Sequence, residues 1–383
     1  SLNLIFILII ISFYSFSRYS NYGNDAPSHI YFFLIILFYL FSDNNLNSSE
    51  NNFFKISILS VYLFTLKPFM LFVLVIPFII FIKSKKKINL IKNKNSLFCF
   101  LFLFLWILKN VLISGCVIFP ISKTCLGSFK HVDLNYVKYF EIEGEAWAKD
   151  APNSKMSYSS ENNVTFDEYR KNFIWLNTWS KNHFKVVVEK ILPVVIFLII
   201  ILIIKFFLEG KKLNLKNKKF KNFKIFEILI ISLLFSFLWF MKFPTYRYGL
   251  SFLMTSIILI TIFLYYFIDS ENNFQKNKKI FTFFLLLAFT GFLMKNFIRI
   301  NNFQYKNNAE YPWPRIFTLS HEKNTNTLKT FKPIYDDKKN LLYYYTGGIE
   351  CSYSTPPCTN FKTNNNKLLL SEKLGYQIYN FKD

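Results

Sequence analysis

Arginine is scarce in this chain, although lysine is abundant. The chain has 46 basic residues and a formal net charge of +23, but its arginines are limited to Arg18, Arg170, Arg247, Arg299 and Arg315. No basic helix carries the interleaved arginine and aromatic residues of a nucleic-acid-binding face. The lysines gather in short segments between apolar blocks, which is typical of membrane-protein loops. We therefore expect no nucleic acid partner.

Familiar catalytic motifs are also missing. The sequence has no GxSxG, HExxH, Walker or glycine-rich nucleotide motif. Without a soluble nucleotide-binding domain, ATP or a nucleotide sugar is disfavoured as a substrate. A substrate carried by a lipid in the plane of the membrane fits better. The sequence does not specify an oligomeric state.

Long apolar blocks dominate what is present. A bilayer core of about 30 Å needs roughly 20 apolar helical residues, because lipid offers no partner for a free backbone N–H or C=O. Blocks that reach or approach this length are Leu97–Ile113, Ile191–Leu208, Phe226–Phe243, Tyr248–Ile268 and Ile280–Phe297. We predict an all-α polytopic membrane bundle of about 8–9 transmembrane helices. The apolar run Leu2–Phe16 begins at once after Ser1, without a Met or a basic segment, so we expect an N-terminally truncated fragment.

The lysine-rich loops predict the orientation. Lys83–Lys94 carries six Lys and no acid, and Glu209–Lys224 carries seven Lys and one Glu. Such loops mark the cytoplasmic side. Because successive helices cross the membrane in opposite directions, residues 114–185 are then predicted to form a long external loop within a transmembrane domain over 1–298. Residues 299–383 are predicted to form an external C-terminal segment. The strand-like pieces of the tail predict a small β-rich cap: Lys339–Tyr345, Lys367–Leu370 and Gly375–Phe381.

The segment Phe53–Ile82 allows two interpretations. Lys67-Pro68 lies in its middle, and proline lacks the N–H that a helix interior needs. Two short helices meeting at an external hinge is the favoured reading. One long kinked helix is the alternative, and it would move Arg18–Ser28 to the cytoplasmic side.

The cysteines and tryptophans concentrate in the predicted external segments. Two closely spaced pairs predict two local disulfides, rather than free thiols or zinc ligands: Cys116 with Cys125, and Cys351 with Cys358. Trp147, Trp175 and Trp179 lie in the loop, where Phe166–Phe184 predicts an amphipathic helix at the membrane interface. These residues either anchor the loop or form a lid with aromatic faces for sugar stacking, Trp147 among them.

Polar groups near the membrane are the candidates for chemistry. Asp25 could act as a general base or bind a divalent metal, with His29 as its partner, or it could simply cap the following helix. Arg247, beside Tyr246 in a short turn, suits a phosphate clamp, because a guanidinium binds two phosphate oxygens. Its structural alternative is a snorkelling side chain. Lys109 and Lys67 are weaker candidates of the same kind. We predict no structural metal site.

Three segments of the chain form distinctive motifs. In the first, Lys109-Asn110 precedes Ser114-Gly115-Cys116-Val117-Ile118-Phe119-Pro120, which resembles the "basic residue, then small-Gly-x-x-aromatic-Pro" segment of bacterial multi-pass proteins related to GT-C glycosyltransferases. The second is similar to their "W…aP..R[FY]G" turn, here Trp239, Phe243-Pro244 and Arg247-Tyr248-Gly249. The third is similar to the "CW…PCTPY" ending of an uncharacterised envelope-protein group, here Cys351 with Pro356-Pro357-Cys358-Thr359. Two positions depart from the patterns: Ser352 replaces a Trp, and Cys116 stands where Asn is common.

The resemblance implies an inverting transferase of the bacterial inner membrane. It would move a sugar from a polyprenyl-phosphate donor to an envelope glycan or lipid acceptor on the external face, with an early acidic residue, here Asp25, as base. An O-antigen-type polymerase or ligase is the first alternative. A non-enzymatic transporter is the second, although the helix interiors contain few polar residues. The lipid bilayer and a lipid-linked sugar are the expected partners.

Overall fold

A computed structural model describes residues 25–41, 46–84, 87–129, 132–151, 165–209, 223–268 and 274–307, together with short strands of the tail. The chain forms two compact units. The first comprises residues 1–109 and 139–300, and the second comprises residues 110–138 and 301–383. Each is described separately below. The sequence-based domain boundary after residue 298 stays a prediction.

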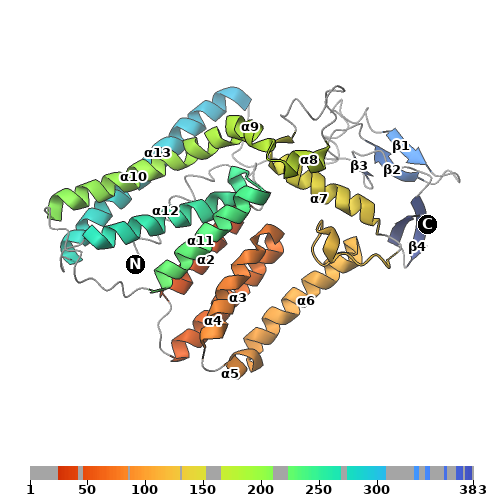
Figure 1. Cartoon of the computed structure of the whole chain (residues 1–383), viewed down its shortest axis with the longest axis horizontal. Coiled ribbons are helices and arrows are strands. Elements are labelled where there is room, and N and C mark those ends of the chain that lie inside the picture. Colours follow the sequence, from red (N-terminus) through yellow and green to blue (C-terminus); the bar gives the residue numbers. More distant parts are fainter. Residues whose placement is uncertain are drawn as a thin grey trace. The chain divides into compact units, whose positions relative to one another are not determined.

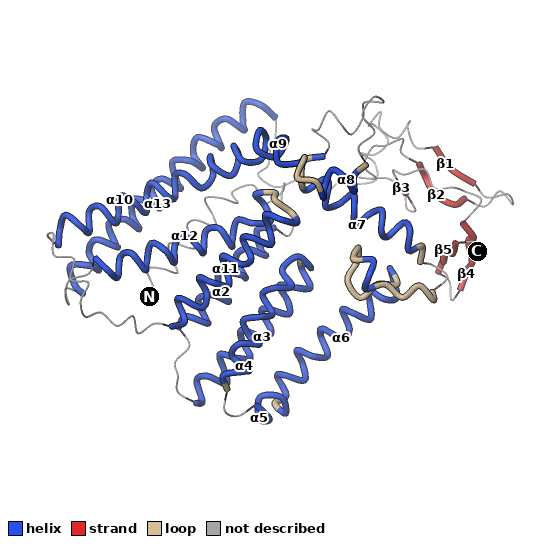
Figure 2. Tube along the Cα trace, in the orientation of Figure 1, coloured by secondary structure: helices blue, strands red, loops and turns tan. Residues whose placement is uncertain are grey.

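The first unit is helical (Figures 1 and 2). Its elements, including helices that continue into the second unit, are α2 (Asp25–Phe41), α3 (Leu46–Leu66), the 3-10 segment η2 (Pro68–Leu74), α4 (Val75–Lys83), α5 (Lys87–Lys92), α6 (Lys94–Ser114), α7 (Leu134–Ala148), α8 (Phe166–Lys171), α9 (Trp175–Trp179), the π-helical turn η5 (Ser180–Phe184), α10 (Lys185–Glu209), α11 (Phe223–Lys242), α12 (Tyr246–Ile268) and α13 (Phe274–Asn307).

Four helical stretches in the described part of the chain are long and apolar enough to cross a membrane. They are Lys94–Ser114, Trp175–Ile204, Phe223–Lys242 and Tyr246–Leu264. Shorter apolar helices cover Pro27–Phe41, Asn52–Leu66 and Pro68–Lys83. The protein is therefore helical and of the membrane class, as the apolar blocks predict. The run Leu2–Phe16 lies outside the described residues, and a span within α13 stays a prediction.

The chain reverses direction at Lys67-Pro68, in agreement with the hinge interpretation. η2 and α4 both pack against α3. Near the open end of this hairpin, the rings of Phe53 and Phe81 lie 6.5 Å apart, although they are far apart in sequence. One long kinked helix would separate those rings by its full length. Lys67 and the start of α2 consequently lie at the same end of the helix bundle.

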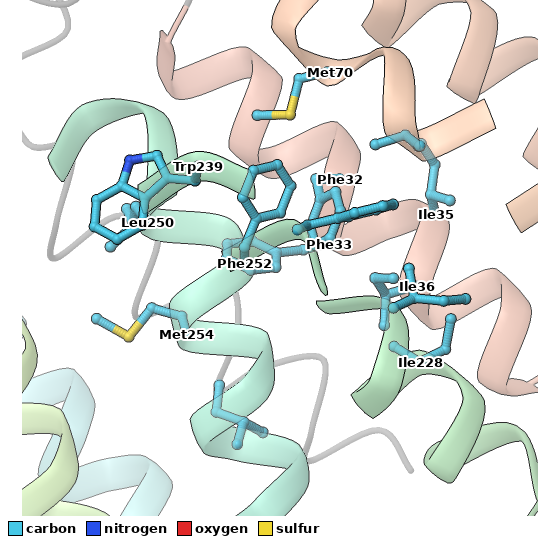
Figure 3. Close-up of a cluster of buried hydrophobic side chains, with 14 of the residues drawn as sticks. Phe32, Phe33, Ile35, Ile36, Met70, Ile228, Trp239, Leu250, Phe252 and Met254 are labelled. Carbon is cyan, nitrogen blue, oxygen red and sulfur yellow. The ribbon is translucent and has the colours of Figure 1, made fainter. Parts of the chain in front are cut away.

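An aromatic and aliphatic core joins α2, η2, α11 and α12 (Figure 3). Phe252 of α12 lies at its centre, with its ring 5.3 Å from Phe32 and 5.4 Å from Phe235. Met70 of η2 and Trp239 of α11 are also buried in this cluster. Interlocking of side chains from helices far apart in sequence fixes the ends of these helices relative to one another.

The mid-chain segment packs onto α11 through its tryptophans. The rings of Trp175 and Trp179 lie 5.5 Å and 5.1 Å from that of Phe240. The expected amphipathic helix over Phe166–Phe184 is wrong in its continuity. The chain breaks between α8 and α9, where Phe173 adopts a positive φ of 56°. Such a backbone conformation interrupts a right-handed helix.

In its described residues, the second unit contains one disulfide and short strands. Cys116 and Cys125 are bonded, as predicted, with the 3-10 turn η3 (Ser122–Thr124) between them. β1 (Lys332–Tyr335) and β2 (Leu341–Tyr345) are antiparallel, and β3 (Cys358–Thr359) joins β2 in parallel. β4 (Leu368–Lys373) pairs with β5 (Tyr376–Phe381). Cys351 lies outside the described residues, so its bond to Cys358 and a single β-rich cap stay predictions.

Candidate functional site

The turn between α11 and α12 is built around Trp239. Its indole Nε1 donates a hydrogen bond of 2.8 Å to the carbonyl oxygen of Thr245. The indole also lies against Gly249, where a Cβ atom would stand 2.3 Å from the ring. From the mid-chain segment, Nε1 of Trp179 donates to the carbonyl oxygen of Pro244 at 2.5 Å. These contacts fix the backbone on both sides of Arg247.

A buried ion pair faces this turn. Asp25 opens α2 and Lys67 lies at the hairpin turn, and the two are only 5% and 7% exposed. Lys67 Nζ donates to Asp25 Oδ1. The Asp25 carboxylate contacts the side chains of Lys67 and Arg247. The carboxylate thus links the start of α2 to the hairpin turn and to α12.

Arg247 joins the pair from α12. Its Nε lies 3.9 Å from Asp25 Oδ2, and its side chain is 50% exposed. Its carbonyl oxygen lies 2.8 Å from His29 Nε2, so the imidazole donates from this nitrogen. His29 is fully buried. This hydrogen bond ties the first turn of α2 to the first turn of α12 and makes His29 a residue that holds the site in shape.

Tyr248 packs beneath both cations. Lys67 Nζ lies 4.3 Å, and Arg247 Cζ 5.1 Å, from the centre of its ring. The Tyr248 hydroxyl also accepts a 3.2 Å hydrogen bond from Arg247 Nη2. An aromatic ring stabilises cations near its face. Apart from His29, the cluster holds two cations and one carboxylate, and thus one excess positive charge. We call Asp25, His29, Lys67, Arg247 and Tyr248 the Arg247 cluster.

The structure brings together four of the residues expected to bind or react, namely Asp25, His29, Lys67 and Arg247. Tyr246 is half-buried in the first turn of α12. Lys109 is exposed on α6, and its side chain makes no ion pair within the described part of the chain. Trp147 is 52% exposed on α7. Trp175 and Trp179 are buried, so they are packing residues rather than exposed stacking surfaces.

A second charged cluster fastens the mid-chain segment and was not predicted. Glu145 accepts from Lys149 Nζ at 2.7 Å and from Arg170 Nη1 at 2.8 Å, and Lys242 Nζ lies 3.3 Å away. Asp167 Oδ1 lies 2.6 Å from Arg170 Nη2. These residues, which we call the Glu145 cluster, link α7 and α8 to the end of α11. Since Glu145 belongs to no motif, only an acid and a base four residues apart hinted at it.

Electrostatics of the Glu145 cluster follow from burial and pairing. Burial raises the pKa of Glu145, but hydrogen bonds from Lys149 and Arg170 and the charge of Lys242 outweigh it, so the pKa lies below its usual value. Burial lowers the pKa of Lys149, despite its bond to Glu145. Hydrogen bonds from Lys171 and Arg170 lower the pKa of Asp167. Burial lowers the pKa of Arg170, but its two acidic partners raise it overall.

Asp150 adds a further link beside this cluster. It is buried and has a positive φ of 73°. Its Oδ2 accepts from Asn182 Nδ2 at 2.7 Å, and its Oδ1 lies 3.4 Å from His183 Nε2. Asn182 and His183 belong to the π-helical turn η5. A strained residue thus holds an irregular helical turn in place.

The opposite end of the bundle has its own polar contacts. Glu227, near the start of α11, accepts from Lys83 Nζ at the end of α4 and from the Tyr39 hydroxyl in α2. Because Glu227 is near the start of α11 and Arg247 follows its end, the two lie about one helix length apart. Among the residues that the structure describes, no group of three or more His, Cys, Asp or Glu side chains could hold a metal ion.

Comparison with known proteins gives a family but no activity. No curated protein and no solved structure matches the chain. One family model, described as a domain of unknown function (DUF8201), matches residues 1–254. That span is about two thirds of the 383 residues and includes both charged clusters. This chain belongs to the DUF8201 family.

Proposed function

We propose that this protein is a membrane transferase that binds a lipid-carried phosphate at the Arg247 cluster. The observation that supports it best is the half-exposed guanidinium of Arg247 beside the buried Asp25–Lys67 pair. Arginine suits phosphate because its planar group donates two parallel hydrogen bonds. The excess positive charge of the cluster favours an anion over a neutral ligand.

The proposed reaction is transfer of a sugar from a polyprenyl-phosphate donor to an envelope glycan or lipid acceptor. Asp25 takes the proton of the acceptor hydroxyl, whose oxygen attacks the anomeric carbon. The bond from that carbon to the phosphate oxygen breaks, and Arg247 holds the departing phosphate. Oδ2 is the oxygen of Asp25 for this role, since Oδ1 is engaged by Lys67.

The proposal includes a location. The Arg247 cluster would face the outside of a bacterial inner membrane, within a bundle of about 8–9 helices. The tail, as a β-rich cap with its C-terminus, would lie on the same side. The support is the grouping of Asp25, Lys67 and Arg247 at the bundle end opposite to the lysine-rich segment Lys83–Lys94.

The test uses the full-length protein in a strain that lacks its gene. Arg247→Gln and Asp25→Asn should abolish the envelope glycan and cause the polyprenyl-phosphate sugar to accumulate, measured by mass spectrometry of extracted lipids. Loss of one such electrostatic contact costs about 100-fold to 1,000-fold in rate. Arg247→Lys keeps the charge but loses the two-pronged geometry, and should retain part of the activity.

Lys185→Gln is the matched control, because Lys185 is 76% exposed and lies outside the cluster. Immunoblots of the membrane fraction establish equal protein amounts. Full activity of both Arg247→Gln and Asp25→Asn would refute the assignment. A change in glycan chain length, without loss of a sugar, would favour a polymerase or ligase instead.

A further inference from the structure

The end of the bundle opposite to the Arg247 cluster carries exposed lysines. Lys87 and Lys92 belong to the short helix α5, and Lys94 opens α6. All three side chains are exposed, and none has an ion-pair partner within the described part of the chain. No Asp or Glu occurs in the sequence between Glu50 and Asp133. The charges of these three lysines are therefore available to a binding partner outside the protein.

Lys83, four residues before Lys87, shows the contrast. It pairs with Glu227 and lies 5.2 Å from the ring centre of Phe223, so its role within the protein is clear. The same pair fixes the end of α4 to the start of α11. α11 has 20 residues and thus spans about 30 Å, the thickness of a bilayer core. The exposed lysines accordingly lie at the opposite membrane boundary from Arg247.

Exposed apolar side chains accompany these lysines. Ile88 and Ile91 of α5 are 67% and 53% exposed, and Leu97 and Phe98 of α6 are also exposed. Leu90 is buried, and its carbonyl oxygen accepts a hydrogen bond from Ser96 Oγ, which fixes α5 against α6. A short helix with basic and apolar side chains, at the end of a membrane-spanning helix, suits the boundary between headgroups and acyl chains.

We propose that α5 and the first turn of α6 form a binding surface for anionic phospholipid. Lys87, Lys92 and Lys94 bind the headgroup phosphates, and Ile88 and Ile91 insert among the acyl chains. The charge complementarity and the continuity with α6 select this partner over a soluble protein. The surface lies away from the Arg247 cluster and does not depend on the proposed reaction.

The experiment measures lipid selectivity by electron spin resonance. The full chain is reconstituted in phosphatidylcholine bilayers with spin-labelled phosphatidylglycerol or phosphatidylcholine, and the motionally restricted fraction gives the relative association constant. Each lysine near an anionic headgroup contributes about fivefold at low salt. We expect wild type to prefer phosphatidylglycerol by at least about fivefold, and Lys87→Gln/Lys92→Gln/Lys94→Gln to lose this preference.

The control removes lysine charges at the other end of the bundle. Lys181→Gln/Lys185→Gln should keep the wild-type preference, because these two lysines closely follow Trp179, which bonds to the α11–α12 turn. A triple lysine-to-arginine variant of the proposed surface should also keep it. The proposal is overturned if the wild type shows no preference for phosphatidylglycerol. It is also overturned if Lys87→Gln/Lys92→Gln/Lys94→Gln keeps the preference, or if the control variant loses it to the same extent.

Discussion

Replacement of Gly249 by alanine should displace the turn that carries Arg247. A Cβ at this position would lie 2.3 Å, 2.4 Å and 2.6 Å from three atoms of the Trp239 indole. The indole is rigid, and its Nε1 is bonded to the Thr245 carbonyl oxygen. Relief of the clash requires either rotation of Trp239, with loss of that hydrogen bond, or a shift of the first turn of α12.

The expected cost combines three contributions. Overpacking costs about 1–3 kcal/mol, and the lost hydrogen bond about 1 kcal/mol. The higher helix propensity of alanine, compared with glycine, offsets up to about 1 kcal/mol of this cost. Gly249→Ala should therefore destabilise the protein by about 1–3 kcal/mol. Gly144→Ala is the control, because this exposed helical glycine has no atom within 4 Å of an added Cβ. It should stabilise by about 0.5–1 kcal/mol.

Thermal unfolding of the purified full chain in detergent, followed by tryptophan fluorescence, compares the two variants. Trp239→Leu supplies a second check, since removal of the indole should relieve the clash. Trp239→Leu should therefore lower the stability of Gly249→Ala by less than it lowers that of the wild type. A double-mutant cycle measures this coupling. Equal stability of Gly249→Ala and Gly144→Ala would refute the packing argument.

Three other changes have expected results. Glu145→Gln leaves Lys149 and Arg170 without their buried acid. It should lower the free energy of unfolding by about 2–4 kcal/mol, measured by thermal unfolding, and speed hydrogen exchange over 139–184. The control Glu189→Gln changes an exposed pair and should alter stability by under about 0.5 kcal/mol. Because the folded-state pKa of Glu145 is lowered from 4.5, its stabilisation is present above that pH and is lost as pH falls through the lower value. Unfolding curves measured at decreasing pH should thus fall less steeply for Glu145→Gln, and equal slopes would contradict this. Cys116→Ser opens a short disulfide loop and should destabilise the second unit by about 2–3 kcal/mol, seen as faster hydrogen exchange over 110–138 relative to Cys99→Ser.

Apolar runs predicted the membrane helices well because the bilayer imposes a length on them. Leu97–Ile113 lies within α6, and Tyr248–Ile268 lies within α12. The reversal at Lys67-Pro68 was also predictable, since proline interrupts a helix. The break at Phe173 was not, because neither Gly nor Pro marks it. A positive φ at Phe173 depends on packing of the surrounding chain.

The candidate site was predictable only residue by residue. Asp25, His29, Lys67 and Arg247 each stood out as polar groups near apolar blocks, but their grouping depends on how α2, α3 and α12 pack. That packing comes from side chains such as Phe32 and Phe252, and no local pattern encodes it. Glu145 was missed for the same reason, since two of its three cationic partners, Arg170 and Lys242, are distant in sequence.

The residues of the turn motif differ in how far they are held by the rest of the protein. Trp239 needs Gly249 beneath it and holds the Thr245 carbonyl oxygen, while the Pro244 carbonyl oxygen accepts from Trp179. The backbone of Arg247 is likewise occupied, by His29. Its guanidinium is different, because half of the side chain reaches the surface. Within the described part of the chain, its polar contacts are a 3.9 Å approach to Asp25 and a hydrogen bond to Tyr248. A turn held from three sides that presents one arginine to the surface supports the proposal that Arg247 binds an anionic ligand.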